Sequence, residues 1–216
     1  MNIRAITWVS PFALAVTMLA ASAQSAAPAA GGSTAPAITP LTKEVAVARA
    51  FGGKYGRIPG NIRAADFDEG PEGTAFHNIG PVHDPDAKVG VRADGLAYRK
   101  TPIEIEIGWG TTQIAATKAG EWMNYTVDVA RDGLYDLEVV ASAFVPAERA
   151  AAFRIEFDGE DKTGDIVPPN TGKWYIFKTT TKKGIPLKKG FQTMRVVFTR
   201  GEHAMNLADL RFVPAE

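Results

Sequence analysis

The sequence predicts an all-β fold, an antiparallel β-sandwich of the jelly-roll type, from three observations. Apolar residues alternate with polar ones in several short segments, so that each segment would turn one face to a core and the other to water. Gly, Pro, Asn and Asp separate these segments at short intervals, which is typical of a sandwich or barrel. The chain also holds 21 Gly and 14 Pro, a composition that favours many turns over long helices.

Five apolar stripes form the expected core. The turn dipeptides Asp132-Gly133 and Asp158-Gly159 fall at the ends of stripes, where a strand would reverse direction. Burying a ring such as that of Phe153 contributes roughly 1.5–3 kcal/mol, so five stripes suffice for a stable core. In chain order, the expected inward residues are Met123, Tyr125, Val127 and Val129; Leu137, Val139, Ala141 and Ala143; Phe153, Ile155 and Phe157; Met194, Val196 and Phe198; and Ala208, Leu210 and Phe212.

Composition excludes several classes of function. The 216 residues carry 24 Lys+Arg against 24 Asp+Glu, and this zero net charge argues against a general nucleic-acid binder. There is no cysteine, which excludes disulfide scaffolds, thiolate metal sites and cysteine nucleophiles. No serine lies in a Gly-x-Ser-x-Gly turn, so a serine hydrolase is not expected.

The N-terminal region has the layout of an export signal. Residues 1–23 combine a positive start, an apolar stretch and the Ala21-Ser22-Ala23 cleavage motif. Residues 24–44, rich in Ala, Pro, Gly and Ser, are expected to form a flexible linker, and residues 45–216 the β-sandwich. We therefore expect a secreted or periplasmic monomer that has no contact with a membrane once the signal is cleaved.

Six blocks of sequence, in order, are similar to those of family 6 carbohydrate-binding modules, jelly-roll domains appended to many polysaccharide-degrading enzymes. The Gly-Glu-Trp block at 119–127 is the most specific of the six. The resemblance covers about Phe51 to Phe212 and implies a lectin-like β-sandwich. The blocks are Phe51–Ile62, Ala64–His77, Tyr98–Glu106, Ala119–Val127, Asn170–Trp174 and Asn206–Phe212.

The resemblance also implies a sugar site at the edge of the sandwich, with two aromatic rings and one asparagine. Trp174 stands at the position of one ring and Asn206 at that of the asparagine. The position of the other ring is occupied by Ala116, and Trp109 is the candidate to replace it. The family can also use the face of one sheet, and the sequence leaves the choice between the two sites open.

The family's structural calcium is not expected here. The positions that the resemblance assigns to its ligands hold Arg63, Ala65 and Ala208, which lack the oxygen donors that calcium requires. A second possible metal site is the loop containing His77, His83, Asp84 and Asp86, but its spacing matches no defined motif. We expect no cofactor and no bound metal.

Two charged features remain beside the resemblance. Glu104 and Glu106 lie on one face of a predicted strand, where a glycosidase would need two carboxyl groups, although nothing near them in the sequence would raise either pKa. Eight basic residues and no acidic ones lie between Lys173 and Arg200. This segment either protects an exposed edge strand or selects anionic glycans.

The function expected from these features is non-catalytic polysaccharide binding, with no catalytic residue. Trp174, Asn206, Trp109, Lys173 and His203 are the candidate binding residues. The first alternative is a secreted polysaccharide-active enzyme, a hydrolase or lyase, that would use Glu104, Glu106, Glu121 or the His/Asp loop. The second is a degenerate module that serves as a structural or protein-interaction domain.

Overall fold

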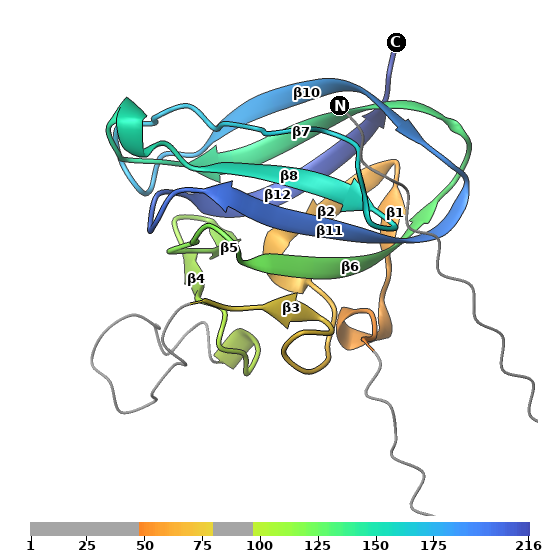
Figure 1. Ribbon diagram of the computed structural model, residues 1–216, viewed down its shortest axis with the longest axis horizontal. Helices are drawn as coiled ribbons and strands as arrows, with labels where there is room; N and C mark the ends of the chain where they lie inside the picture. The colour runs from red at the N-terminus through yellow and green to blue at the C-terminus, as the bar shows by residue number, and fades with distance from the viewer. Residues whose placement is uncertain (1–47, 80–96) are drawn as a thin grey trace, which may run out of the picture. The chain divides into compact units, whose positions relative to one another are not determined.

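A computed structural model describes residues 48–79 and 97–216, and in these residues it shows two β-sheets packed face to face (Figure 1). All the described residues belong to one compact unit, Glu44–Glu216. The fold is the predicted antiparallel β-sandwich. Within the described ranges, no helical segment has the length and apolar character that crossing a membrane requires.

The first sheet is built around the long strands that the sequence predicted. Its order is β1-β6-β11-β8-β9, and β3 pairs with β6 from outside this path. All pairings are antiparallel except that of β1 with β6. Its strands are β1 (Gly56–Ile58), β3 (Phe76–His77), β6 (Trp122–Val129), β8 (Ala152–Phe157), β9 (Glu160–Asp161) and β11 (Gly190–Arg200).

The second sheet carries the candidate site. Its order is β10-β7-β12-β5-β4, and β2 pairs with β12. The lysines of the basic segment lie in part on β10, which is an edge strand of this sheet. Its strands are β2 (Gly60–Arg63), β4 (Ile105–Gly108), β5 (Thr111–Ile114), β7 (Gly133–Ser142), β10 (Lys178–Leu187) and β12 (Asn206–Pro214).

The core lies between the two sheets and is made of the predicted apolar stripes. Met123, Val127 and Leu137 are fully buried, whereas polar neighbours on the same strands, such as Thr126 and Glu138, are partly exposed, as the alternation requires. The hydroxyl of Tyr125, buried with the core, donates a hydrogen bond of 2.7 Å to the backbone oxygen of Ala64. Three short 3₁₀ turns complete the fold: η1 (Phe51–Gly53), η2 (Ala64–Asp66) and η3 (Ala147–Arg149).

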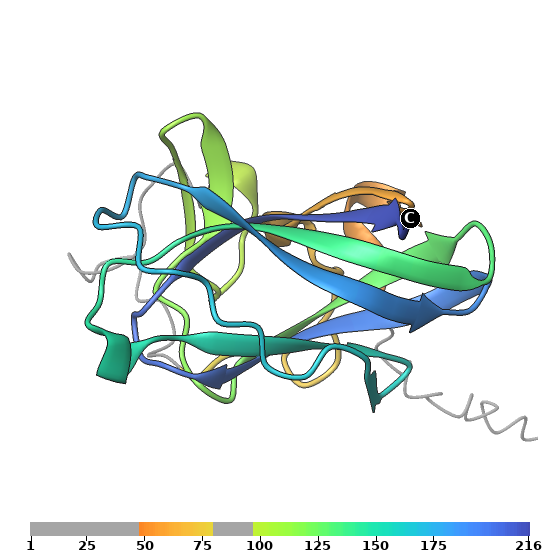
Figure 2. The same cartoon turned by 90° about the horizontal axis from the view of Figure 1, so that it is seen from above.

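The hairpin β4–β5 and the loop that precedes β10 lie at the same end of the sandwich (Figure 2). The hairpin turns at Trp109 and Gly110, which both have positive φ, 53° and 81°. This arrangement places Trp109 at an exposed tip, close to the loop that carries Trp174.

Candidate functional site

Trp174 and Asn206, which the sequence placed in one sugar site, lie on neighbouring segments of the structure. Asn206 is the first residue of β12 and pairs with Ser142 at the end of β7. The Ser142 hydroxyl donates a hydrogen bond of 2.7 Å to the backbone oxygen of Trp174. One buried serine therefore connects the loop that carries the aromatic ring with the strand that carries the amide.

The loop before Trp174 is fastened to the chain segment that follows β7. The Thr171 hydroxyl lies 2.9 Å from the backbone oxygens of both Ala143 and Lys173. The Asn170 amide donates to the backbone oxygen of Val145 at 2.7 Å, and its oxygen accepts from the Gly172 N–H at 2.8 Å. These bonds hold the loop in place before a ligand arrives, which lowers the entropic cost of binding.

Phe144 is an aromatic residue of the site that the sequence analysis missed. Its ring meets that of Trp174 edge to face, with centroids 6.2 Å apart and an interplanar angle of 82°. Trp174 is half-buried against the core, whereas Phe144 is 52% exposed. The signal in the sequence was a large apolar residue at the outward position between the inward Ala143 and Val145.

The Asn206 side-chain amide is buried at the start of β12. The residue is only 5% exposed. In the part of the chain that the structure describes, no side chain or backbone group forms a hydrogen bond with this amide. A buried amide normally has partners, so hydroxyl groups of a bound sugar are suited to that role.

Ala116 and His203 lie on two segments that touch each other. The backbone N–H of His203 donates to the oxygen of Thr117 at 2.9 Å, and the backbones of Lys118 and Glu202 pair in an isolated antiparallel β-bridge. The His203 side chain is exposed on a turn three residues before Asn206 in the sequence. The methyl group of Ala116 supplies no stacking surface, so this side of the site lacks the ring that the resemblance implied.

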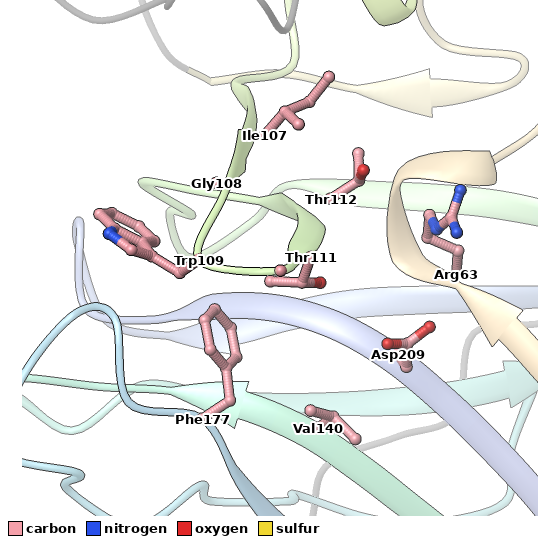
Figure 3. Close-up of a pocket in the computed structure, with 10 residues that line it drawn as sticks. Arg63, Ile107, Gly108, Trp109, Thr111, Thr112, Val140, Phe177 and Asp209 are labelled. Atoms are coloured by element: carbon pink, nitrogen blue, oxygen red, sulfur yellow. The ribbon is translucent and has the colours of Figure 1, made fainter.

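Trp109 lines a cleft on the outward face of the second sheet. The cleft has a volume of about 540 Å³, and Ala116 is not among its lining residues. Trp109 and Phe177 lie at one end of the cleft, and Arg63 and Asp209 at the other (Figure 3). The replacement of the missing ring by Trp109 stays a prediction, because in this structure Trp109 faces the cleft.

The polar end of this cleft is formed by two paired strands. Arg63 on β2 is the register partner of Asp209 on β12. The Asn61 amide donates to the Asp209 carboxylate at 2.8 Å, and the Arg63 guanidinium donates to the Tyr98 hydroxyl at 3.2 Å. A cleft with aromatic walls and a few fixed polar groups is the usual form of a small-molecule or sugar site.

Lys173 is exposed beside the aromatic residues. Its ammonium nitrogen lies 5.8 Å from the centre of the Tyr175 ring. Tyr175 in turn lies 6.1 Å from Trp109, measured between ring centres. The structure therefore connects Lys173 with Trp109 through Tyr175.

The residues at the implied calcium positions do not fit a calcium ion. Ala65 and Ala208 are buried and have no side-chain oxygen, and Arg63 brings a positive charge. The half-buried Arg99 donates hydrogen bonds to the backbone oxygens of Ala65, Phe67 and Asp68, and its guanidinium carbon lies 3.7 Å from the Phe67 ring centre. Desolvation lowers the pKa of Arg99, although nearby acidic groups favour its charge. The absence of a structural calcium stays a prediction.

The second suggested metal site falls mostly outside the described residues. His83, Asp84 and Asp86 are among residues 80–96, and His77 lies 2.6 Å from the Glu72 carboxylate through its Nδ1. Within residues 48–79 and 97–216, no three His, Asp or Glu side chains form a group that could hold a metal.

The expectation that neither Glu104 nor Glu106 has a raised pKa is wrong for Glu104. The pKa of Glu104 is raised to about 7, chiefly by burial and also by the charges of Glu106 and Glu121, against the opposing effect of Lys118. Glu121 comes close only through the fold, so the sequence around Glu104 held no signal of this effect.

Comparisons with known proteins agree with the fold. The sequence profile of the carbohydrate binding module family 6 matches residues 97–214, more than half of the chain. No curated protein matches the chain.

Three solved structures are among those similar to this chain. A β-1,3-glucan-binding family 6 module from Bacillus halodurans is 20% identical, with a TM-score of 0.49 over 74% of this chain and 98% of that one. A family 6 module from Clostridium stercorarium in complex with cellobiose is 15% identical, with a TM-score of 0.50 over 76% and 99%. A family 43 arabinoxylan arabinofuranohydrolase from Bacillus subtilis is 12% identical, with a TM-score of 0.51 over 74% of this chain but 28% of the enzyme. At these identities the last two matches support the fold alone, and it is the sequence profile that shows that the chain belongs to family 6 of carbohydrate-binding modules.

Proposed function

We propose that this protein is an exported, non-catalytic module that binds polysaccharide at the edge of its second sheet. Trp174 stacks on the C–H face of a sugar ring, and Asn206 forms hydrogen bonds with its hydroxyl groups. The observation that carries this proposal is the hydrogen bond from Ser142 to Trp174, which joins the ring-bearing loop to the strand of Asn206. A family whose members bind carbohydrate supports the same role.

The affinity of this site is expected to be modest. One half-buried ring and one amide supply few contacts, and they must offset the freedom that a flexible polysaccharide loses on binding. Because hydrogen bonds already hold the loop in place, the entropy that the protein loses on binding is small. His203, exposed on the adjacent turn, is an additional hydrogen-bonding group at the rim of the site.

The finer part of the proposal is a preference for anionic glycans. Lys173 and Lys178 are both exposed and lie at the two ends of the segment that carries Trp174 and Phe177. Uronate or sulfated polymers would place negative charge near these ammonium groups. The export signal expected at residues 1–23 would bring the protein to such polymers outside the cytoplasm.

The test is a binding screen of the purified domain against neutral and anionic polysaccharides, followed by calorimetry on the best ligand. Cellobiose, which is bound in the Clostridium stercorarium structure, makes β-glucans a useful neutral probe. W174A should abolish binding, and because the ring is half-buried against the core it should also lower the melting temperature while the domain stays folded. N206A should weaken binding by about 1–2 kcal/mol, because a sugar hydroxyl loses its partner.

The matched control is F191A, which removes another exposed ring, on β11 outside the site. It should bind like the wild type. Undiminished binding by W174A would contradict the proposal and place the sugar elsewhere on the molecule.

The raised pKa of Glu104 favours one alternative, a polysaccharide-active enzyme. A carboxyl group that titrates near pH 7 can donate a proton to a leaving oxygen, and Glu106 lies two residues further along the chain, on β4. Release of reducing sugar during the binding screen, lost in E104Q, would establish this alternative. If the protein neither binds polysaccharide nor releases reducing sugar, and a protein partner binds it reproducibly, the domain is instead an interaction domain.

A further inference from the structure

Two consecutive residues of the loop before β10 place their rings against two different aromatic partners. Trp174 meets Phe144, with ring centres 6.2 Å apart, and Tyr175 meets Trp109 at 6.1 Å. Because Trp174 and Tyr175 are neighbours in the chain, one loop carries a ring of each pair. We call these four residues, Phe144, Trp174, Tyr175 and Trp109, the aromatic row.

The aromatic row is exposed to an extent that packing does not explain. Phe144, Tyr175 and Trp109 are 52%, 50% and 49% exposed. By contrast, a core pair such as Phe153 and Phe198 is buried almost completely. Contiguous exposed aromatic surface on a folded protein usually marks a place where a ligand or partner binds.

The two ends of the aromatic row meet two different polar sites. At one end, Phe144 follows Ser142, the residue that pairs with Asn206. At the other, Trp109 lines the cleft whose far end holds Arg63 and Asp209 (Figure 3). The row is thus continuous with the proposed sugar site and also with the cleft.

The backbone at Trp109 adds an independent observation. Its φ of 53° is unusual for a residue other than glycine and strains the backbone. The hairpin nevertheless presents an indole at this tip, with a glycine on either side. Such strain is commonly kept at positions that contact ligands.

We infer that the aromatic row makes one continuous binding surface, so that a single polysaccharide chain spans from Asn206 across the row into the cleft. The ligand is then an extended internal segment of the polymer rather than a chain end or a disaccharide. This inference rests on the proposed function and specifies the ligand's form. Contacts at both ends of one chain add their effects, because the second contact forms at a high effective concentration.

The experiment measures affinity by calorimetry against cello- and laminari-oligosaccharides from the disaccharide to the hexasaccharide. For the series that binds, the wild-type affinity should rise by about tenfold or more with length. W109N and Y175A should each remove most of that gain, and Y175A should leave disaccharide binding unchanged. Asn is chosen at position 109 because it tolerates the left-handed backbone.

Controls separate this inference from the proposed function. F191A should keep the full dependence on length, and melting temperatures should show that every variant is folded. The inference is overturned if the wild-type affinity does not rise with oligosaccharide length, or if W109N and Y175A show the same rise as the wild type. In either case, disaccharide binding that depends on Trp174 still upholds the proposed function. Failure of the wild type to bind any member of either series, or any polymer in the screen, overturns both.

Discussion

Single residues at the site have properties that depend on neighbours brought in by the fold, and Glu104 is the clearest case. Its folded pKa of about 7 exceeds the ordinary value of 4.5, chiefly because burial disfavours its charge. Between these two values the native state holds more protons than the unfolded state. The free energy of unfolding therefore falls as pH rises from about 4.5 to 7 and stays lower above that range.

E104Q removes this loss, because glutamine is neutral at every pH. The variant should unfold with a free energy about 1 kcal/mol higher than the wild type at pH 8, a value reduced for solvent screening of a half-buried group. The difference should vanish below pH 4.5. Urea unfolding at several pH values measures it, with E148Q at an exposed position of η3 as the control. A constant difference across pH would refute the assignment.

What the sequence could reveal about the site also differs residue by residue. Trp174 and Asn206 were found through the family's motifs, and their proximity in the structure agrees with that origin. Phe144 was missed although its outward position in the alternation was visible in the sequence, and Tyr175 was missed because residues of its loop follow no period. Arg99 was missed because its acceptors are backbone oxygens, which every residue carries.

Among the elements, β10 links charge to the binding surface. It is the edge strand of the second sheet, and the loop that carries Trp174 leads directly into it. Lysines on such a strand discourage pairing with another chain, and this role is consistent with the topology. The selection of anionic glycans is a separate claim about the same residues and needs its own test.

If Lys173 and Lys178 select charge, binding of a uronate or sulfated polymer should fall steeply between low and high salt. Surface charges are screened over about 10 Å at 0.1 M ionic strength, whereas stacking on Trp174 is almost independent of salt. Replacing both lysines by glutamine should remove the preference and keep neutral binding. If neutral and anionic polymers show equal salt dependence, and the double variant aggregates more, the role of the two lysines is protection of the edge strand.

The strands themselves were predictable because alternation has a period of two. Met123, Val127 and Leu137 alternate with polar neighbours and are buried as expected. The short strands β4 and β5 carried a weaker signal, since Ile107 looks like a core residue yet is 37% exposed at the cleft. Its position at the end of a hairpin, beyond the reach of the opposite sheet, accounts for the difference.

At the scale of the whole molecule, the guanidinium group of Arg99 holds the segment in and just after η2. Arg99 donates hydrogen bonds to three backbone oxygens in the segment from Ala65 to Asp68, and its guanidinium group stacks on the Phe67 ring. We expect this arrangement to replace calcium in holding the same segment. The melting temperature should be equal in chelator and in millimolar calcium.

R99K should lower the free energy of unfolding by about 3 kcal/mol, because an ammonium cannot reach the same oxygens and leaves some of them unpaired. R57K is the matched control, since Arg57 is an exposed arginine that also lies over a ring. A melting temperature that falls in chelator and recovers with calcium would contradict this account.

The fastening of the loop before β10 has a consequence for how this protein can diversify. Asn170, Thr171 and Ser142 hold the loop through backbone oxygens, and none of these bonds involves an aromatic side chain. Mutation can therefore exchange the exposed rings while the scaffold beneath them stays as it is. Proteins that evolve from this chain could therefore change their glycan specificity by a few surface substitutions, because the folded scaffold stays the same.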